Sequence, residues 1–280
     1  MVTADEFYQE LIKEIESNQI VLPTLPEVAL QVRDAVEDPN ASASQVSKII
    51  STDAALTARL IQVANSPAYR GRNPIENLQT AIARMGANVV KNLVTGLVMQ
   101  QMFQATAEAT DKRLRHTWEH STEVAAISQM MATQFAGVKP DEAMLAGLVH
   151  DIGVLPILVR AEEMPELLED EATLDDLIEK LHTKIGKIIL ESWGFQPNII
   201  AVAAEHEDLT RDSGEQVDYV DIVQAANIQS YFGKSHPLAT IDFNSVPSLV
   251  KLGLTEEEIH ITDVEDSGSG VNEMASILSA

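Results

Sequence analysis

The sequence predicts an all-α protein, and two observations carry that prediction. Apolar residues recur at helical spacing nearly throughout the 280 residues, for example at Phe7, Leu11 and Ile15. No stretch survives a test for the apolar–polar alternation of period two that a half-buried strand requires. Hydrophobic residues make up 45% of the chain, which is enough to bury a substantial core.

The first half of the chain predicts a series of helices separated by short connections. In order, they lie around 7–15, 27–38, 44–50, 54–65 and 86–102. Asp53 stands where a side chain can cap the fourth of them. Residues 65–74 are dense in Asn, Ser, Pro and Gly, which predicts a loop. Asn65 is interpreted as a turn residue whose side chain holds local backbone groups.

The second half continues the helical pattern with longer segments. The predicted helices cover 112–135, 140–152, 173–193, 196–207 and 216–232. Residues 162–171 are acidic and interrupted by proline, which favours a solvated connection or a short helix. After residue 235 the helical signals are scattered. Residues 263–270 are typical of a flexible linker, and the short amphipathic piece 271–278 that follows is expected to be frayed.

Charge and cysteine content exclude several function classes. Nineteen Lys and Arg against 43 Asp and Glu give a net charge of −24, which argues against binding nucleic acid or an anionic membrane surface. Most of that charge lies in 141–280, where it is either solubilising or a surface for a basic partner or cations. There is no cysteine, which excludes disulfides, thiolate metal sites and cysteine nucleophiles.

Two further observations bear on location. The N-terminus is acidic where a signal peptide needs basic and apolar residues. We find no run that approaches the ~18 apolar residues of a membrane span. We therefore expect a cytoplasmic protein with no membrane partner.

The histidines are the most informative polar residues. Four of the seven, His120, His150, His182 and His206, lie on apolar faces of four different predicted helices, and Asn227 lies on a fifth. One inward histidine is most often a hydrogen-bonded core residue. Several buried imidazoles without partners would cost about 1–3 kcal/mol each, so a shared partner is needed.

A cation, or the carboxylate of Asp151 beside His150, would satisfy these imidazoles together. Imidazole and carboxylate ligands suit Fe, Mn, Zn or Ni, and such a metal can lower the pKa of a bound water to about 7. We expect at most one divalent transition metal, held by His120, His150, Asp151 and His182 or His206. The alternative treats the histidines as packing residues only. Trp118 and Trp193 are interpreted as core anchors.

Several motifs together resemble the HDOD domain, an HD-related output domain of bacterial signalling proteins. They are residues 22–26 (LPTLP), 50–60 (ISTDAALTARL), 64–69 (ANSPAY) and 81–86 (AIARMG), and the resemblance extends over about 18–232. His150-Asp151 after an apolar run, with His120 upstream, is similar to the HD superfamily of metal-dependent phosphohydrolases.

The resemblance implies a fold and a set of site residues. The fold is an N-terminal helical subdomain over 1–105, packed on an HD-like helical subdomain over 106–262, with the tail 263–280. His120 matches the first histidine of the HD superfamily, and His150-Asp151 match the HD pair. His182 and His206 match histidines of the HD-GYP branch, whereas Asn227 stands where that branch has an aspartate.

The resemblance also implies a regulatory function. HDOD domains are described as output modules without established catalysis, so we expect a non-catalytic signal-transduction module with a degenerate metal or ligand pocket and a signalling protein as partner. A weak metal-dependent phosphodiesterase acting on a nucleotide or cyclic dinucleotide is the alternative, and it leaves a small anionic nucleotide-type ligand open. Val154 replaces the lysine that the HD-GYP branch carries, so a substrate phosphate lacks an evident cation.

Overall fold

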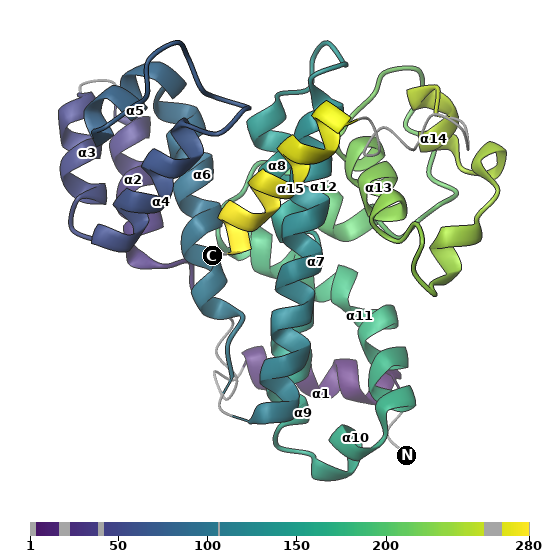
Figure 1. The fold of residues 1–280 in the computed structure, drawn as a ribbon. Helices are drawn as coiled ribbons and strands as arrows, with labels where there is room; N and C mark the ends of the chain where they lie inside the picture. The colour runs from purple at the N-terminus through teal and green to yellow at the C-terminus, as the bar shows by residue number, and fades with distance from the viewer. Residues whose placement is uncertain (1–3, 17–22, 39–41, 106, 255–264, 280) are drawn as a thin grey trace.

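The computed structural model describes residues 4–16, 23–38, 42–105, 107–254 and 265–279, and within these ranges it contains helices and no strand. The all-α prediction is therefore confirmed. Figure 1 shows two groups of helices side by side, with α7 as the long central helix between them. The first group consists of α2 (Glu27–Glu37), α3 (Ala43–Ile50), α4 (Ala54–Ala64), α5 (Leu78–Met85), α6 (Ala87–Met99) and the 3-10 turn η1 (Gln100–Met102).

The starts of these helices follow from side-chain capping. Asp53 accepts a hydrogen bond from the amide of Leu56 and begins α4, as the sequence predicts. Ser42, two residues before the expected start of α3, forms a capping box with Gln45. Asn65 ends α4, and its side-chain amide exchanges two 2.8 Å hydrogen bonds with the backbone of Ile75. This confirms its interpretation as the residue that holds the loop.

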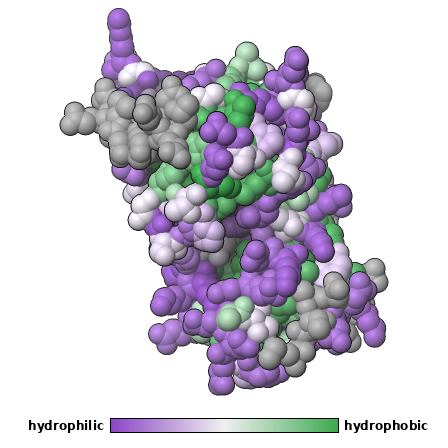
Figure 2. Space-filling view, turned by 90° about the vertical axis from the view of Figure 1, so that its right-hand side faces the viewer, coloured by the Kyte–Doolittle hydropathy of each residue, from purple (hydrophilic) through white to green (hydrophobic). Residues whose placement is uncertain are grey.

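The second group surrounds α7 (Glu108–Ala132), which packs against α8, α13 and α15. Its helices are α8 (Pro140–Val149), α9 (Val154–Ala161), α10 (Pro165–Glu169), α11 (Glu171–Ser192), α12 (Pro197–Glu205) and α13 (Tyr219–Ser230). The 3-10 turns η2 (Pro237–Thr240) and η3 (Phe243–Ser245), α14 (Pro247–Leu252) and α15 (Glu265–Ser279) follow. One apolar core runs through both groups, and Gly96 of α6 leaves room for the side chain of Leu148 of α8. On the face that carries α13 and α14, hydrophobic residues gather in the upper part and hydrophilic residues cover the lower part (Figure 2).

The first helix does not lie with the first group. α1 (Ala4–Glu16) packs against α11, and Glu14 pairs with Arg160 of α9 at 2.9 Å. Phe7 and Leu11 are buried on the same face, as their spacing predicts. The division of the chain at residue 105 stays a prediction. Although α1 precedes that residue in sequence, it lies beside α11 of the second group (Figure 1).

The C-terminal segment differs from the flexible tail expected over 263–280. Residues 265–279 form α15, which packs on α7 and α4, and buries Val271, Met274 and Leu278. The guanidinium of Arg59 donates to the carbonyl oxygens of Ile277 (3.1 Å) and Leu278 (2.8 Å), which have no partner within the helix. The Gly-Ser composition of the segment obscured an apolar face that is complete enough to dock.

The sequence analysis was also wrong about the longest apolar run. Residues 140–161 contain an 18-residue window with a mean hydropathy of 1.6, and by length and composition alone they could span a membrane. They are the core helices α8 and α9 with the turn between them, and 83% of the most apolar window is buried inside the fold.

The turn between α8 and α9 approaches α11 so closely that no side chain fits at Gly153. A Cβ atom there would overlap the carbonyl oxygen of His182 and crowd the amide nitrogen of Gly186. At Gly186, on the other side of the same contact, a Cβ atom would lie 3.5 Å from its nearest neighbours, an ordinary contact distance. The two glycines face each other across this contact, but only Gly186 leaves room for a Cβ atom.

We expect Gly153→Ala to lower the free energy of unfolding by about 1–3 kcal/mol, since the overlap forces α11 away from the turn. Gly186→Ala is the matched control and should change it by less than about 1 kcal/mol, because alanine is the better helix former. Urea unfolding followed by circular dichroism measures both. Equal stability of the two variants would contradict the close approach.

Candidate metal centre

His150 and Asp151 occupy the end of a helix that is buried on every side. Residues 143–149 of α8 are all buried, and the two ligand-type residues follow directly in the turn. His150 is fully buried, and its Nδ1 lies 2.6 Å from the carbonyl oxygen of Gly147. Nδ1 therefore carries the proton and donates it, which leaves the lone pair of Nε2 pointing away from the helix.

His182 and His206 are held in the same way. Nδ1 of His182 donates to the carbonyl of Ile178 at 2.7 Å, and Nδ1 of His206 donates to the carbonyl of Val202 at 3.0 Å. Each imidazole is thus oriented by the backbone one turn earlier in or beside its own helix. Backbone carbonyls that fix the tautomer in this way are the usual second partner of a metal-binding histidine.

The carboxylate of Asp151 lies at the centre of the cluster. Its Oδ2 lies 3.4 Å from Nε2 of His150 and 4.0 Å from Nε2 of His120, which comes from the middle of α7. Its Oδ1 lies 3.5 Å from Nε2 of His182 and 3.4 Å from Nε2 of His206. The fold brings together all five residues that the sequence singled out.

The five side chains form two groups that share one carboxylate. His120, His150 and Asp151 make one group, and Asp151, His182 and His206 make the other; within each, the ligand atoms lie within 4.8 Å of one another. The sequence analysis expected one ion with His182 or His206 as an additional ligand. The two-sided arrangement offers a place on each side of Asp151.

Two features of the cluster show that these residues fit a cation. Nε2 of His182 and Nε2 of His206 lie 3.2 Å apart, although both Nδ1 atoms already donate to carbonyls. Two lone pairs at this distance need a proton or a metal ion between or beside them. In addition, Nε2 of His150 is buried without a hydrogen-bond partner among the described residues. Imidazole and carboxylate are donors that divalent transition metals accept.

Burial and the neighbouring charges shift the pKa values in opposite directions. Burial raises the pKa of the Asp151 carboxyl, but the surrounding imidazoles outweigh it and hold that pKa well below its usual value. Burial lowers the pKa of His206, yet its hydrogen bond to Asp151 and the charges of Asp151 and Glu207 leave the pKa raised overall. Burial and the neighbouring His150 lower the pKa of His120 to about 3, and burial lowers that of His150.

Several residues around the cluster escaped the sequence analysis. Tyr231 lies 5.0 Å from the ring of His120 and stacks on His236 with ring centroids 3.6 Å apart. Glu207 lies 3.6 Å from Nε2 of His206. Tyr231 and His236 follow α13, where the helical periodicity ends, so no pattern pointed to them. Glu207, directly after His206, was the one that the sequence could have indicated.

Other expectations can be placed in the structure. Asn227 is 4% exposed, and its Oδ1 has no hydrogen-bond partner among the described residues. Trp118 and Trp193 are buried core anchors, as expected, and Nε1 of Trp193 donates to the carbonyl of Pro23.

Residues 22–209 match the HDOD domain family. The chain belongs to the HDOD family. The match spans all five cluster residues and ends before Asn227 and Tyr231. It confirms the resemblance drawn from the motifs.

Solved structures agree with this assignment. A protein of Shewanella amazonensis SB2B, provisionally named a metal-dependent phosphohydrolase, has 31% identity and a TM-score of 0.85, covering 99% of this chain and all of that one. An HDOD domain protein of unknown function from Geobacter sulfurreducens shares the fold, with 22% identity, a TM-score of 0.69 and 97% coverage of both chains. An uncharacterized protein of Treponema pallidum is 24% identical over 225 residues, and this HDOD chain spans 42% of its length.

The lowered pKa of His120 predicts a pH dependence of stability in metal-free protein. In the unfolded chain this histidine takes up a proton below about pH 6.5, whereas in the folded chain it stays neutral down to about pH 3. Stability is therefore lost as the pH falls through this window. Between about pH 6.5 and about pH 5, the wild type should lose about 1.5 kcal/mol more than His120→Asn.

Urea unfolding in the presence of a chelator measures this difference. The matched control is His116→Asn, because His116 is exposed one turn earlier on α7 and lies outside the cluster. If His120→Asn keeps the slope of the wild type, His120 is not held neutral by its surroundings.

Proposed function

We propose that this HDOD chain is a signal-transduction module whose histidine–aspartate cluster binds a divalent transition metal and couples it to a partner signalling protein. The observation that supports a metal site is the convergence of four imidazoles, three of them oriented by backbone carbonyls, on one partly buried carboxylate. His120, His150, Asp151, His182 and His206 would hold it. When bound, such a metal supplies a Lewis acid and lowers the pKa of a coordinated water.

The protein's own contribution is to keep these donors ready. The backbone carbonyls of Gly147, Ile178 and Val202 fix three imidazoles with Nε2 toward Asp151 before any cation arrives. Because the ligands come from α7, α8, α11 and the end of α12, a bound ion would join four helices and stiffen the second group. In a signalling protein, such a link would transmit a displacement of one helix to the other three.

The charges near the cluster favour regulation over hydrolysis of a phosphate ester. Glu207 lies beside His206, and the ammonium of Lys234 is paired with Glu123 at 2.8 Å. An anionic substrate would meet these carboxylates, and Val154 stands where the HD-GYP branch has a lysine. Substrate phosphate groups normally need cationic side chains or several metal ions in compensation.

A metal-dependent phosphodiesterase is the second candidate, and one observation favours it. Asp151 directs one carboxylate oxygen toward each of two histidine pairs, which is the arrangement that two neighbouring ions require. The provisional name of the 31% identical Shewanella protein belongs to the same class of activity.

Metal content separates the proposals from a purely structural cluster. Untagged wild-type protein, analysed by mass spectrometry, should carry or take up Fe, Mn, Zn or Ni in near-stoichiometric amount. His150→Ala and Asp151→Asn should reduce this by about tenfold or more, whereas His116→Ala, exposed on α7, should retain it. Failure of the metal-free wild type to take up any of these ions contradicts both candidates.

Turnover separates the two candidates from each other. The metal-loaded wild type is incubated with bis-p-nitrophenyl phosphate and with a cyclic dinucleotide. The signalling proposal expects no hydrolysis above a blank that contains the metal alone. Hydrolysis that His150→Ala abolishes and His116→Ala preserves would establish the phosphodiesterase instead.

A further inference from the structure

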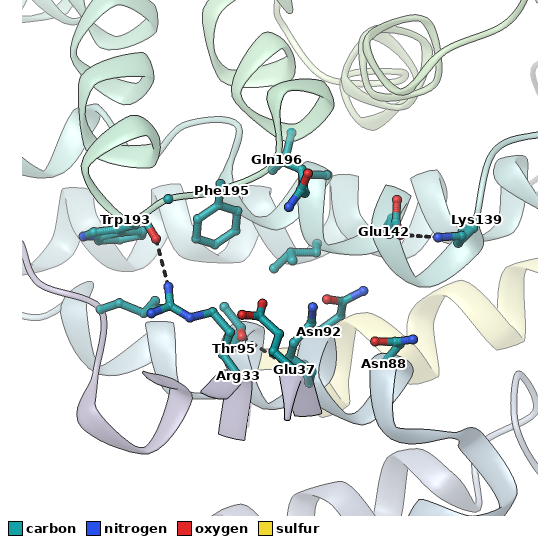
Figure 3. Close-up of a pocket in the computed structure, with 15 residues that line it drawn as sticks. Arg33, Glu37, Asn88, Asn92, Thr95, Lys139, Glu142, Trp193, Phe195 and Gln196 are labelled. Carbon is teal, nitrogen blue, oxygen red and sulfur yellow. Dashed lines mark hydrogen bonds and ion pairs between the residues drawn. The ribbon is translucent and has the colours of Figure 1, made fainter. Parts of the chain in front are cut away.

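A second cavity lies between the two groups of helices, away from the histidine cluster. It has a volume of about 180 Å³, is partly open to solvent, and is bordered by α2 and α6 on one side and by α8, the end of α11 and the start of α12 on the other. Figure 3 shows the side chains of Glu37, Phe195 and Gln196 directed into this space from opposite walls. None of its lining residues belongs to the histidine cluster, and the family match gives the cavity no role.

One wall of the cavity is apolar and aromatic. Leu25, Leu145, Trp193, Phe195 and Ile199 line it, and all of them except Phe195 are buried. Burying an apolar group of a ligand against such a surface contributes about 25 cal/mol per Å². This wall therefore suits a small hydrophobic or aromatic body.

The polar side chains of the cavity fall into two kinds. Some are already satisfied: Glu142 accepts from Lys139 (2.7 Å) and from the hydroxyl of Tyr219 (2.8 Å), and Arg33 donates to the carbonyl of Trp193 (3.0 Å). The Arg33 contact joins the two walls, whereas the Glu142 contacts lie within one of them.

Asn92 and Thr95 are satisfied as well, since they donate to Asp141 and to the carbonyl of Lys91. A few other polar side chains of the cavity make no such contact. Glu37 of α2, which is exposed, and Lys91 of α6, which is half-buried, carry opposite charges at the same cavity, and neither makes an ion pair or a side-chain hydrogen bond within the described part of the chain. The same holds for the side-chain amide of Gln196. Unpaired charges of both signs beside an apolar wall match a ligand that itself carries both charges and an apolar group.

Size narrows the class of ligand. The volume of about 180 Å³ lies below the ~300–1,000 Å³ of pockets for drug-sized ligands. A dinucleotide is far too large for it. A single amino acid is of the right order.

We propose that this cavity binds a free α-amino acid with an apolar side chain. Its ammonium group pairs with Glu37, its carboxylate pairs with Lys91, and its side chain packs against Phe195 and Ile199. The site is independent of the metal, since none of its lining residues belongs to the histidine cluster.

The cavity and the histidine cluster share helices through which a bound ligand would affect the cluster. Glu142 and His150 are separated by eight residues of helix, or about 12 Å, and Ile199 and His206 by about 10 Å. The helix α11 likewise carries His182 in its middle and ends at Trp193. The cavity thus contacts one end of three helices whose other parts present metal-type ligands.

Three matched compounds test the proposal on the 280-residue chain. L-phenylalanine carries both charges, 2-phenylethylamine lacks the carboxylate, and 3-phenylpropanoate lacks the ammonium group. Binding is followed by calorimetry and by the fluorescence of Trp193, which lines the cavity. We expect saturable binding of L-phenylalanine and at least about tenfold weaker binding of the other two.

Variants assign each charge to its partner. Glu37→Gln and Lys91→Met should each weaken L-phenylalanine by about tenfold. Glu37→Gln should leave 3-phenylpropanoate unaffected, and Lys91→Met should leave 2-phenylethylamine unaffected. Glu27→Gln, exposed on α2 outside the cavity, and Lys48→Met, exposed on α3, are the controls that should bind like the wild type.

Three results would overturn the proposal. The first is the absence of saturable binding of L-phenylalanine and L-leucine by the wild type. The second is equal binding of all three phenyl compounds, which would remove the role of the charges. The third is tight binding of AMP at Trp193 in place of the amino acids, which would assign the cavity to a nucleotide.

Discussion

The interaction between the partly buried carboxylate of Asp151 and four imidazoles is the constraint on which the second group of helices depends. A buried charge is unfavourable unless it is paired and hydrogen-bonded, so the histidines must come close to it. They come from different helices, and the packing of α7, α8, α11 and α12 must therefore converge on one point. Gly153 allows the final approach, because any side chain there would collide with α11.

This cluster is incompletely satisfied by protein atoms alone. Every Nδ1 of His150, His182 and His206 is used by a backbone carbonyl, so the lone pairs of Nε2 are presented inward. A packing-only role would give these nitrogens donors of their own. The raised pKa of His206 is consistent with compensation by a proton in the cation-free protein, because Nε2 of this ring faces both Asp151 and His182. A metal ion and this proton compete for the same place.

The sequence predicts the cluster well because each of the four histidines lies on an apolar helical face, so its inward direction follows from periodicity. His150 and Asp151 also follow an apolar run that is buried in the core. The residues beyond the regular helices were not predictable in this way: Tyr231 and His236 meet His120 through a turn after α13. The docking of α15 was missed because a Gly-Ser segment obscured its apolar face, and the packing of α1 on α11 was missed because periodicity gives a buried face but not its partner.

The proposed metal site and the proposed amino-acid site draw on different sets of helices. The first group of helices contributes one wall of the cavity and none of the metal-type ligands, whereas α8, α11 and α12 contribute to both. The hydrogen bond from Arg33 to the carbonyl of Trp193 connects the two groups at the cavity. The proposed amino acid would therefore act where the groups meet, and the proposed metal where the helices of the second group converge.

The most direct test of the central claim is anomalous X-ray diffraction from crystals of the full chain grown with Mn²⁺. The account predicts an anomalous peak among His120, His150, Asp151, His182 and His206, on one or both sides of the Asp151 carboxylate. A cluster with the same imidazole orientations and no anomalous peak, while Mn²⁺ is present in the crystal, would contradict it.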